Sequence, residues 1–254
     1  MPVMPDHKEA VSRLAQMIDA SRTIVPFTGA GISTESGIPD FRSPGGLWTQ
    51  NRPISFQDFV ADASLRREAW RRRFAMADAF GSARPNIGHE VIASWIKEGR
   101  APAVITQNID NLHQDAGVAA DKVVEIHGNT TYATCLSCGR RHELAWIRPI
   151  FEATGDAPAC EACGGILKTA TISFGQQMPL EAMQQAKALA SECDLFIVLG
   201  SSLVVYPAAD LPQLARRNGA RVVILNREPT GCDRVAHLIV RGEIGDILES
   251  IIHR

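Results

Sequence analysis

The sequence of 254 residues lacks the features that direct a chain to a membrane or to nucleic acid. It contains no apolar run close to the roughly 20 residues that a membrane-spanning helix needs. Its first ten residues lack the apolar core of a signal peptide and include Asp6, Lys8 and Glu9. The formal net charge is −2, from 26 basic and 28 acidic residues, so no basic surplus favours DNA or RNA. We therefore expect a cytoplasmic protein that binds neither a membrane nor a specific nucleic acid.

The sequence also lacks internal repeats and low-complexity segments. Hydrophobic residues make up 45% and charged residues 21%, which is typical of globular proteins. The length suits one large domain, or one domain with a small insertion. These values do not fix the oligomeric state, and a monomer is compatible with them. The basic run from Arg71 to Arg73 is expected to be a solvated face of a helix.

Short apolar runs alternate with amphipathic stretches along most of the chain. Apolar residues recur with helical spacing in residues 7–20, 180–190 and 208–217. Buried strands are expected at residues 23–27, 103–106, 123–126, 195–199 and 222–225. This alternation predicts an α/β fold with a parallel sheet that is covered on both faces. Ligands bind such sheets outside the carboxyl ends of the strands.

Two segments interrupt the alternation. Residues 46–85 contain two tryptophans and a run of arginines but no clear strand, and residues 130–168 contain paired cysteines and little apolar sequence. We therefore predict a Rossmann-like parallel-sheet domain, formed by residues 1–45, 86–129 and 169–254. A helical lobe or flap is expected at 46–85, and a small zinc-binding module at 130–168.

The cysteines form two C-x-x-C pairs, separated by 21 residues: Cys135 with Cys138, and Cys160 with Cys163. Glycines follow both pairs, which suits tight turns that direct two thiolates to one metal. Four thiolates complete a tetrahedral zinc shell and leave no position for water, so the predicted site is structural. Redox pairs or free thiols are the alternative. Cys193 and Cys232 stand alone and are expected to be buried thiols.

A glycine-rich turn, Gly29-Ala30-Gly31, follows the first predicted strand. Dinucleotide-binding folds place their pyrophosphate turn there, and small residues let backbone N–H groups approach a phosphate. The third glycine comes late, at Gly37, so the spacing is not G-x-G-x-x-G, and a plain strand-to-helix turn is equally compatible. Arg42 could neutralise phosphate charge.

The longer segment from Gly29 to Trp48 resembles the cofactor loop of the sirtuins, which are NAD-dependent protein deacylases. Further blocks match sirtuin signatures in the family's order, with the cysteine pairs in the expected gap: residues 106–113, 116–117, 125–128, 200–203, 207–209 and 225–230. The resemblance extends from about residue 25 to residue 245. It implies a Rossmann-like domain with a zinc module, and it implies NAD and zinc as cofactors.

The resemblance also implies the residues that contact NAD. Gln107, Asn108 and Asp110 would surround the nicotinamide and its ribose, with Asn108 as a catalytic residue, and Phe41 would shield the reacting carbon. Asn226 would lie at the adenosine-side ribose. The full set of implied cofactor contacts is Gly29, Ala30, Gly31, Ser33, Ile38, Pro39, Asp40, Phe41, Arg42, Trp48, Gln107, Asn108, Ile109, Asp110, Gly200, Ser201, Ser202, Asn226, Arg227, Glu228 and Ile244.

His127 is the candidate general base, because it follows a predicted strand and imidazole titrates near neutral pH. In the implied reaction the acyl-lysine oxygen attacks the nicotinamide ribose and nicotinamide leaves. His127 then accepts a proton from a ribose hydroxyl, and the products are free lysine and O-acyl-ADP-ribose. Protein ADP-ribosylation at the same NAD site is the alternative function. An NAD-dependent dehydrogenase fits less well, because the turn lacks the G-x-G-x-x-G spacing. A zinc-ribbon regulator that binds nucleic acid also fits less well, because the chain has no surplus of basic residues. By the same resemblance, His113 is expected to be a packing or hydrogen-bonding residue.

The acyl-lysine protein or peptide is expected to bind as an added strand. Its walls would be Phe174 and Gly175 on one side and Leu203, Val204 and Val205 on the other. Gln176 replaces the glutamate that the family usually carries, which removes a negative charge.

The acyl group is expected to contact Trp70 and Arg73. Sirtuins that remove acidic acyl groups recognise them with a Tyr-x-x-Arg motif, and here Trp70 replaces the tyrosine. If Arg73 points into the acyl pocket, it would favour a carboxylate-tipped chain. We favour the other case, in which Arg73 points to solvent and Trp70 lines an apolar tunnel, with deacetylation as the default activity.

Overall fold

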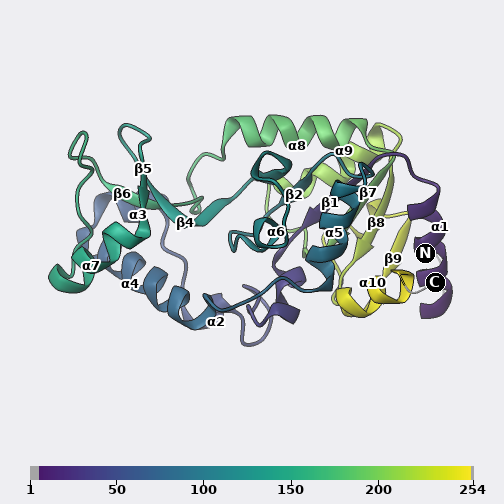
Figure 1. The fold of residues 1–254 in the computed structure, drawn as a ribbon, viewed down its shortest axis with the longest axis horizontal. Helices are drawn as coiled ribbons and strands as arrows, with labels where there is room; N and C mark the ends of the chain where they lie inside the picture. Colours follow the sequence, from purple (N-terminus) through teal and green to yellow (C-terminus); the bar gives the residue numbers. More distant parts are fainter. Residues whose placement is uncertain (1–5, 253–254) are drawn as a thin grey trace.

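A parallel sheet of six strands organises the larger lobe of the computed structural model, which describes residues 6–252 (Figure 1). The ends of the predicted large domain, residues 1–5 and 253–254, lie outside the described residues. The strands lie in the order β3 (Val123–Glu125), β2 (Val104–Thr106), β1 (Ile24–Thr28), β7 (Leu195–Leu199), β8 (Arg221–Leu225) and β9 (Leu238–Val240). Counted along the chain this order is 3-2-1-4-5-6, which is typical of dinucleotide-binding folds. The predicted strands are confirmed, and β9 is an addition.

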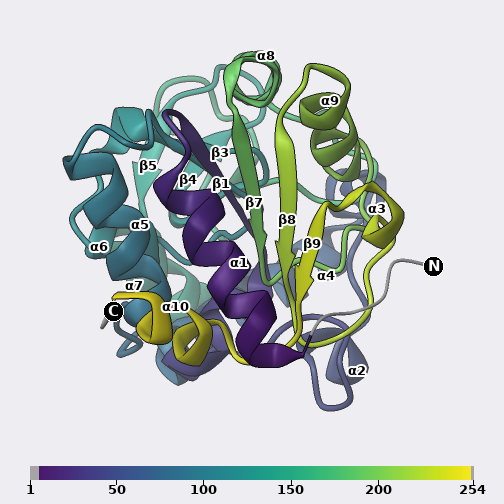
Figure 2. The same ribbon diagram turned by 90° about the vertical axis from the view of Figure 1, so that its right-hand side faces the viewer.

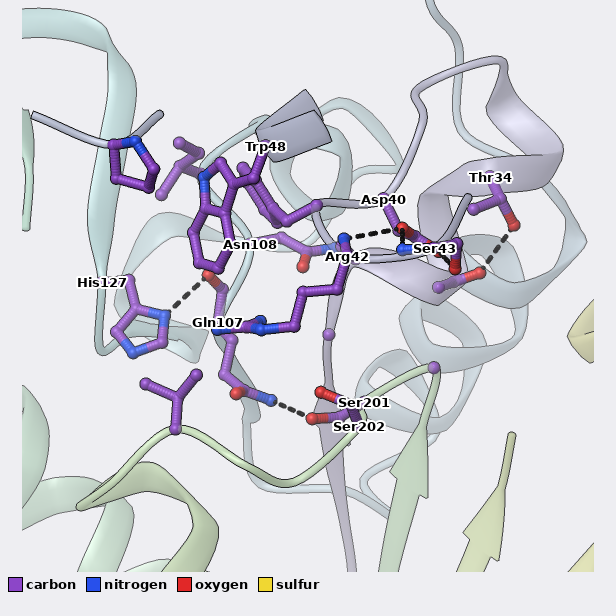
Figure 3. A pocket seen from close by; sticks show the side chains of 18 of the residues that line it. Thr34, Asp40, Arg42, Ser43, Trp48, Gln107, Asn108, His127, Ser201 and Ser202 are labelled. Carbon is purple, nitrogen blue, oxygen red and sulfur yellow. Dashed lines mark hydrogen bonds between the residues drawn. The ribbon is translucent and has the colours of Figure 1, made fainter. Parts of the chain in front are cut away.

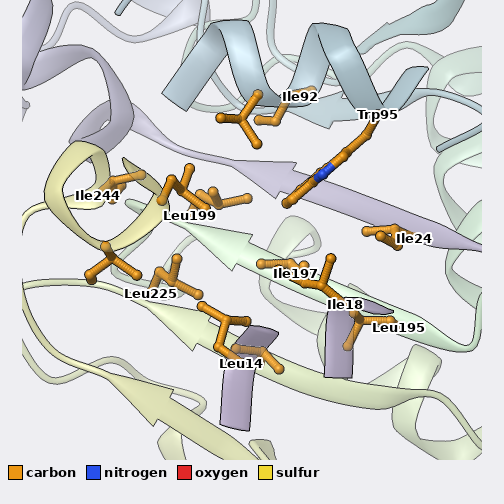
Figure 4. Packing of buried hydrophobic residues seen from close by; sticks show 14 of the residues in the cluster. Leu14, Ile18, Ile24, Ile92, Trp95, Leu195, Ile197, Leu199, Leu225 and Ile244 are labelled. Carbon is orange, nitrogen blue, oxygen red and sulfur yellow. The ribbon is translucent and has the colours of Figure 1, made fainter. Parts of the chain in front are cut away.

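Helices cover both faces of this sheet, as expected from the uninterrupted apolar strands (Figure 2). One face packs against α1 (His7–Asp19), α5 (Ile87–Lys97) and α10 (Ile244–Ile252). The other packs against α8 (Leu180–Glu192) and α9 (Leu211–Arg217). Figure 4 shows Leu14 and Ile18 of α1, and Trp95 of α5, around Ile197 of β7. Each full burial of such a side chain stabilises the fold by about 1.5–3 kcal/mol.

A smaller lobe extends from one side of this domain (Figure 1). Its three-stranded antiparallel sheet has the order β5 (Arg141–Glu143), β4 (Gly128–Cys135) and β6 (Leu167–Thr171). Its helices are α2 (Leu47–Gln50), α3 (Phe56–Ala61), α4 (Ala63–Phe80) and α7 (Leu144–Thr154). Trp70 and Phe74 of α4 share one hydrophobic cluster with Ala133, Ile147 and Leu167. The predicted helical lobe and zinc module therefore pack as one body.

The packing of α4 corrects the role expected for Trp70. The residue is 2% exposed, and its ring stacks on Phe74 at 5.6 Å between centroids. Its neighbours belong to the cysteine-containing module and include Cys135 and Cys160. Trp70 is thus a core residue of the small lobe and does not line an acyl tunnel.

Short helical turns complete the described chain: η1 (Ala30–Ser36), α6 (Leu112–Asp115), η2 (Ala120–Lys122), η3 (Ala208–Asp210) and η4 (Asp233–Val235). Of the helices between residues 6 and 252, none is long and apolar enough to cross a membrane.

The carboxyl ends of five parallel strands meet at one edge of the large sheet, next to the small lobe. The residues that follow these strands are Gly29, Gln107, His127, Gly200 and Asn226, of which His127 comes two residues after the end of β3. The fold therefore gathers at one edge the residue types that the sequence singled out.

Candidate active site

A cavity of about 410 Å³ opens at this edge of the sheet (Figure 3). Most of the predicted cofactor residues line it together with the predicted base and part of the predicted substrate wall. These lining residues are Gly29, Ala30, Gly31, Asp40, Phe41, Arg42, Trp48, Gln107, Asn108, Ile109, His127, Phe174, Gly175, Gly200, Ser201, Ser202, Val205, Asn226, Arg227, Glu228 and Ile244.

A second cavity, of about 320 Å³, shares the wall formed by Ala30, Phe41, Asn108 and Ile109. The remaining predicted cofactor contacts line this cavity: Ser33, Ile38, Pro39 and Asp110. The two cavities therefore divide the predicted cofactor contacts into two adjoining groups.

The turn after β1 lies directly against the turn after β7. The N–H groups of Gly29 and Gly31 donate to the carbonyls of Leu199 and Gly200, at 3.0 and 2.8 Å. A Cβ atom on Gly31 would lie 2.7 Å from the Gly200 Cα atom, so a side chain cannot be accommodated. Both N–H groups are already bonded within the protein, so neither of these two donors is available to a phosphate.

His127 is held in one orientation at the wall of the larger cavity (Figure 3). Its Nδ1 atom lies 3.0 Å from the Gln107 carbonyl oxygen. A carbonyl only accepts hydrogen bonds, so Nδ1 carries the proton and Nε2 keeps its lone pair in the neutral ring. Burial lowers the pKa of His127 below its usual value and so does the charge of Arg42, while the bond to Gln107 opposes them. The neutral form, which can accept a proton, is therefore favoured.

A hydrogen-bonded triad fixes the polar side of the second cavity. Asn108 is 5% exposed, and its Nδ2 donates to Ser33 Oγ at 3.0 Å. Ser33 Oγ in turn donates to the Asp110 carboxylate at 2.7 Å. The backbone N–H of Asn108 donates to Thr106 Oγ1. The Asn108 carboxamide is thus held in one orientation at the wall that both cavities share.

Side-chain bonds also join the ends of neighbouring strands. Gln107 Nε2 donates to Ser201 Oγ at 2.7 Å, which connects the ends of β2 and β7. His113 is 1% exposed, and its Nε2 lies 2.9 Å from Thr28 Oγ1. The expected packing role of His113 is confirmed.

The loop after β8 carries three of the predicted cofactor residues. Asn226 Nδ2 donates to the Glu228 carbonyl at 2.7 Å, and Arg227 pairs with Glu243 at 3.1 Å. Arg241 donates to the carbonyls of Asn226 and Glu228. Glu243 and Arg241 were not predicted as site residues. Glu243 lines the cavity directly before the predicted contact Ile244, and this neighbouring position is the feature of the sequence that could have indicated it.

An aromatic row forms one wall of the larger cavity. The Trp48 ring lies 5.2 Å from the Phe41 ring and 5.2 Å from the Phe174 ring. Of the three hydrophobic residues predicted for the opposite wall of the peptide site, Val205 lines the cavity. Leu203 is 2% exposed and packs into the core, while Val204 is 50% exposed outside the cavity.

Arg73 lies in neither of the environments that we expected for it. Its Nε and Nη2 atoms donate to the Thr130 carbonyl at 2.9 and 2.7 Å. The side chain is half-buried and lines the second cavity, so the prediction that it points to solvent is wrong. Arg71 and Arg72 instead pair with Glu68, as expected for a solvated helix face.

The four paired cysteines converge on one point. Their Sγ atoms all lie within 4.8 Å of one another, with Cys135 to Cys163 at 3.5 Å and Cys138 to Cys160 at 3.7 Å. Four thiolates at about 2.3 Å from a tetrahedral zinc ion have comparable separations, so this donor set fits the metal. A Cβ atom on Gly165 would lie 2.8 Å from Cys135 Sγ, which shows how closely the turns enclose the cluster. Buried His142 places Nε2 3.3 Å from Cys160 Sγ, a contact that the sequence analysis missed. Cys193 and Cys232 are buried thiols, as expected.

Comparisons with known proteins agree with this geometry. Residues 29–207 match the model of the Sir2 family. The chain is 59% identical over 246 residues to an NAD-dependent protein deacetylase of Rhodopseudomonas palustris, covering 97% of both chains. It is also similar to a solved structure described as Sir2 with p53 peptide and NAD+, with TM-score 0.84, 37% identity, and coverage of 96% of this chain and 97% of the other. A structure of Sir2Tm bound to a propionylated peptide gives TM-score 0.83 and 36% identity, with the same coverage.

We predict one zinc ion per chain, and loss of that ion when Cys160 is replaced by serine. The hydroxyl of serine is a poor ligand for zinc at neutral pH, and structural zinc stabilises small zinc peptides by about 10–16 kcal/mol. Elemental analysis of freshly purified protein measures the ratio, with Cys193→Ser as the matched control that keeps its zinc. Zinc-free wild-type protein would contradict the assignment.

The lowered pKa of His127 predicts where activity is lost at acid pH. The base must be neutral, so turnover falls as pH drops through its pKa, and burial places this limb below the ordinary value of 6.5. The measurement is kcat/KM for an acylated peptide against pH at saturating NAD. An acid limb above 6.5 would show that burial does not control this group.

Proposed function

The chain belongs to the Sir2 family, and on that premise we propose that it is an NAD-dependent protein-lysine deacylase that releases nicotinamide and O-acyl-ADP-ribose. The observation that carries the proposal is the fixed, neutral His127 in a cavity shared with the predicted NAD contacts. The homologue from Rhodopseudomonas palustris, named an NAD-dependent protein deacetylase, supports the same activity.

Bound NAD would supply the ADP-ribose that accepts the acyl group, with nicotinamide as the leaving group before the base acts. The loop at Asn226 and Arg227 would hold the adenosine end, and Arg42 would neutralise phosphate charge. Asn108 and Asp110 would hold the nicotinamide end at the second cavity. The continuity of the two cavities at Ala30 and Phe41 supports this division.

His127 would accept a proton at Nε2 from a ribose hydroxyl, because its Nδ1 proton is committed to Gln107. Asn108 would act as a hydrogen-bonding partner at the reacting ribose, with its nitrogen already engaged by Ser33. Phe41 lines both cavities and would exclude water from the point where they meet. Exclusion of water also strengthens the polar contacts inside the site.

The acyl-lysine peptide would enter past the Trp48 and Phe174 rings. Phe174 is 48% exposed, so an apolar surface is available at this mouth. The Phe174 carbonyl accepts a hydrogen bond from Phe56 N–H, and the Gly175 carbonyl accepts one from Gln57 Nε2. A peptide strand that pairs here would therefore bond to the same carbonyls or displace their present donors. Gln176 accepts a bond from Ser173 N, and its neutral side chain supports a weaker preference for basic peptides.

An acetyl group or another apolar acyl group is the proposed preference. Acid-tipped chains need a cation in the acyl pocket, and the Arg73 guanidinium is committed to Thr130 beside the other cavity. We also propose a cytoplasmic location, which the metal-type spacing of the paired cysteines supports. The separate hydrophobic clusters of the two lobes support the predicted domain boundaries.

Replacement of His127 by alanine tests the proposed function. We expect a folded protein that binds NAD but loses deacylation by about 10²–10⁴-fold, because the general base is gone. Mass spectrometry follows one peptide with different lysine acyl groups, with and without NAD, and exposed His7→Ala is the control. Turnover at the wild-type rate would end the assignment of His127. Transfer of labelled ADP-ribose to protein without deacylation would instead support the alternative transferase.

Replacement of Arg73 by alanine tests the acyl preference. We expect the ratio of deacetylation to desuccinylation to stay unchanged, because Arg73 lies away from the proposed acyl site. Acetyl, succinyl and longer fatty acyl versions of one peptide provide the measurement. A selective loss of succinyl removal, from a wild-type rate that exceeds deacetylation, would overturn this preference.

A further inference from the structure

Lys168 is a buried cation in the small lobe. It lies in β6, is 4% exposed, and is absent from the ion pairs of the described residues. Its Nζ atom donates to the Thr171 carbonyl at 2.5 Å and lies 3.4 Å from the Thr169 carbonyl. The Phe59 ring of α3 lies 5.9 Å from Nζ. Burial of an ammonium group costs free energy unless hydrogen bonds compensate for the lost water. The presence of a lysine at this position therefore needs an explanation.

The reason lies in an irregularity of the small sheet. Gly128 pairs with Thr171 and Ala133 with Thr169, so residues 129–132 of β4 stand opposite Ala170 alone. Such a bulge removes regular partners from the strand opposite it. Lys168 bonds the carbonyls of Thr169 and Thr171, the two β6 residues on either side of Ala170, and so spans the residue that faces the bulge. An ammonium group offers three donors, so one side chain can hold both carbonyls.

The segment that Lys168 holds is in direct contact with the backbone of His127. Ile172 N–H donates to the His127 carbonyl at 2.8 Å. A Cβ atom on Gly128 would lie 1.9 Å from the Ala170 carbonyl oxygen, so strands β4 and β6 are in close contact immediately after His127. Thr171 and Ile172 also line the larger cavity. A shift of residues 170–172 would therefore move the imidazole and one wall of the site.

We propose that Lys168 is a positioning residue for His127, which fixes the 169–172 segment of β6 through its ammonium group. The proposal rests on the proposed role of His127 as the base. Burial lowers the pKa of Lys168 to about 8, which leaves the charged form in excess at neutral pH.

The test separates positioning of the base from general damage to the site. Nicotinamide leaves before the base acts, so exchange of labelled nicotinamide into NAD, in the presence of acylated peptide, reports the earlier step. We expect Lys168→Met to lower deacylation by about 10–100-fold, because small misplacements of a catalytic group have large effects. Nicotinamide exchange and KM for NAD should stay near wild-type values, and Lys168→Arg should restore most of the deacylation.

A control variant and a check of the fold accompany this test of Lys168. Exposed Lys187→Met on α8 removes a lysine elsewhere and should leave both activities unchanged. Zinc content and thermal unfolding verify that Lys168→Met is folded. If Lys168→Met unfolds, Lys168→Gln is tested in its place, with the same expected and contradicting results. Wild-type deacylation in Lys168→Met, or a parallel loss of deacylation and exchange, would overturn the positioning role.

His127→Ala distinguishes this inference from the proposed function. If that variant loses deacylation while Lys168→Met does not, only the role of Lys168 fails. If His127→Ala keeps its deacylation, the assignment of the base fails, and the role of Lys168 fails with it.

Discussion

The close approach of two backbone turns is the constraint on which the site depends. Gly200, with φ of 69°, follows β7 and lies against Gly31, and a Cβ atom on Gly200 would lie 2.3 Å from the Ile32 nitrogen. This contact occurs where the strand order reverses, which is where open parallel sheets bind ligands. Because the turns touch, the η1 segment starts at the sheet edge and forms walls of both cavities. A side chain at either glycine would separate the two halves of the site.

The electrostatics of the site follow from burial and not from clustered charge. His127 is kept neutral by its partly buried position and by Arg42, and the Gln107 carbonyl selects the proton position on its ring. Asn108 is oriented by neutral Ser33, which in turn contacts Asp110. Neutral donors and acceptors in fixed orientations suit a reaction whose charge is redistributed in the transition state, since they need no reorganisation.

The sequence predicts the large sheet well because its strands are uninterrupted apolar runs, as in Leu195–Leu199. It does not predict β9, although Leu238–Val240 is an apolar run of the same length as β2 and β3. The paired cysteines and His127 were identifiable from local motifs, and the four-cysteine cluster of the structure fits the predicted zinc ligands. Trp70 and Arg73 were not, because their environments depend on how α4 packs against a module more than fifty residues away in the chain. Lys168 gave no local signal, because its role depends on a bulge between distant strands.

Strand β4 connects the four-cysteine cluster to His127, the proposed base. The strand begins at Gly128, directly after His127, and ends at Cys135, one of the four thiols of the cluster. Its bulge lies between these ends, and Lys168 holds the opposite strand there. Cys135 and Cys160 also belong to the hydrophobic cluster that includes Trp70 and Phe74 of α4. Loss of metal would therefore loosen the end of the same strand that starts at the base, without any direct contact between zinc and the reacting groups.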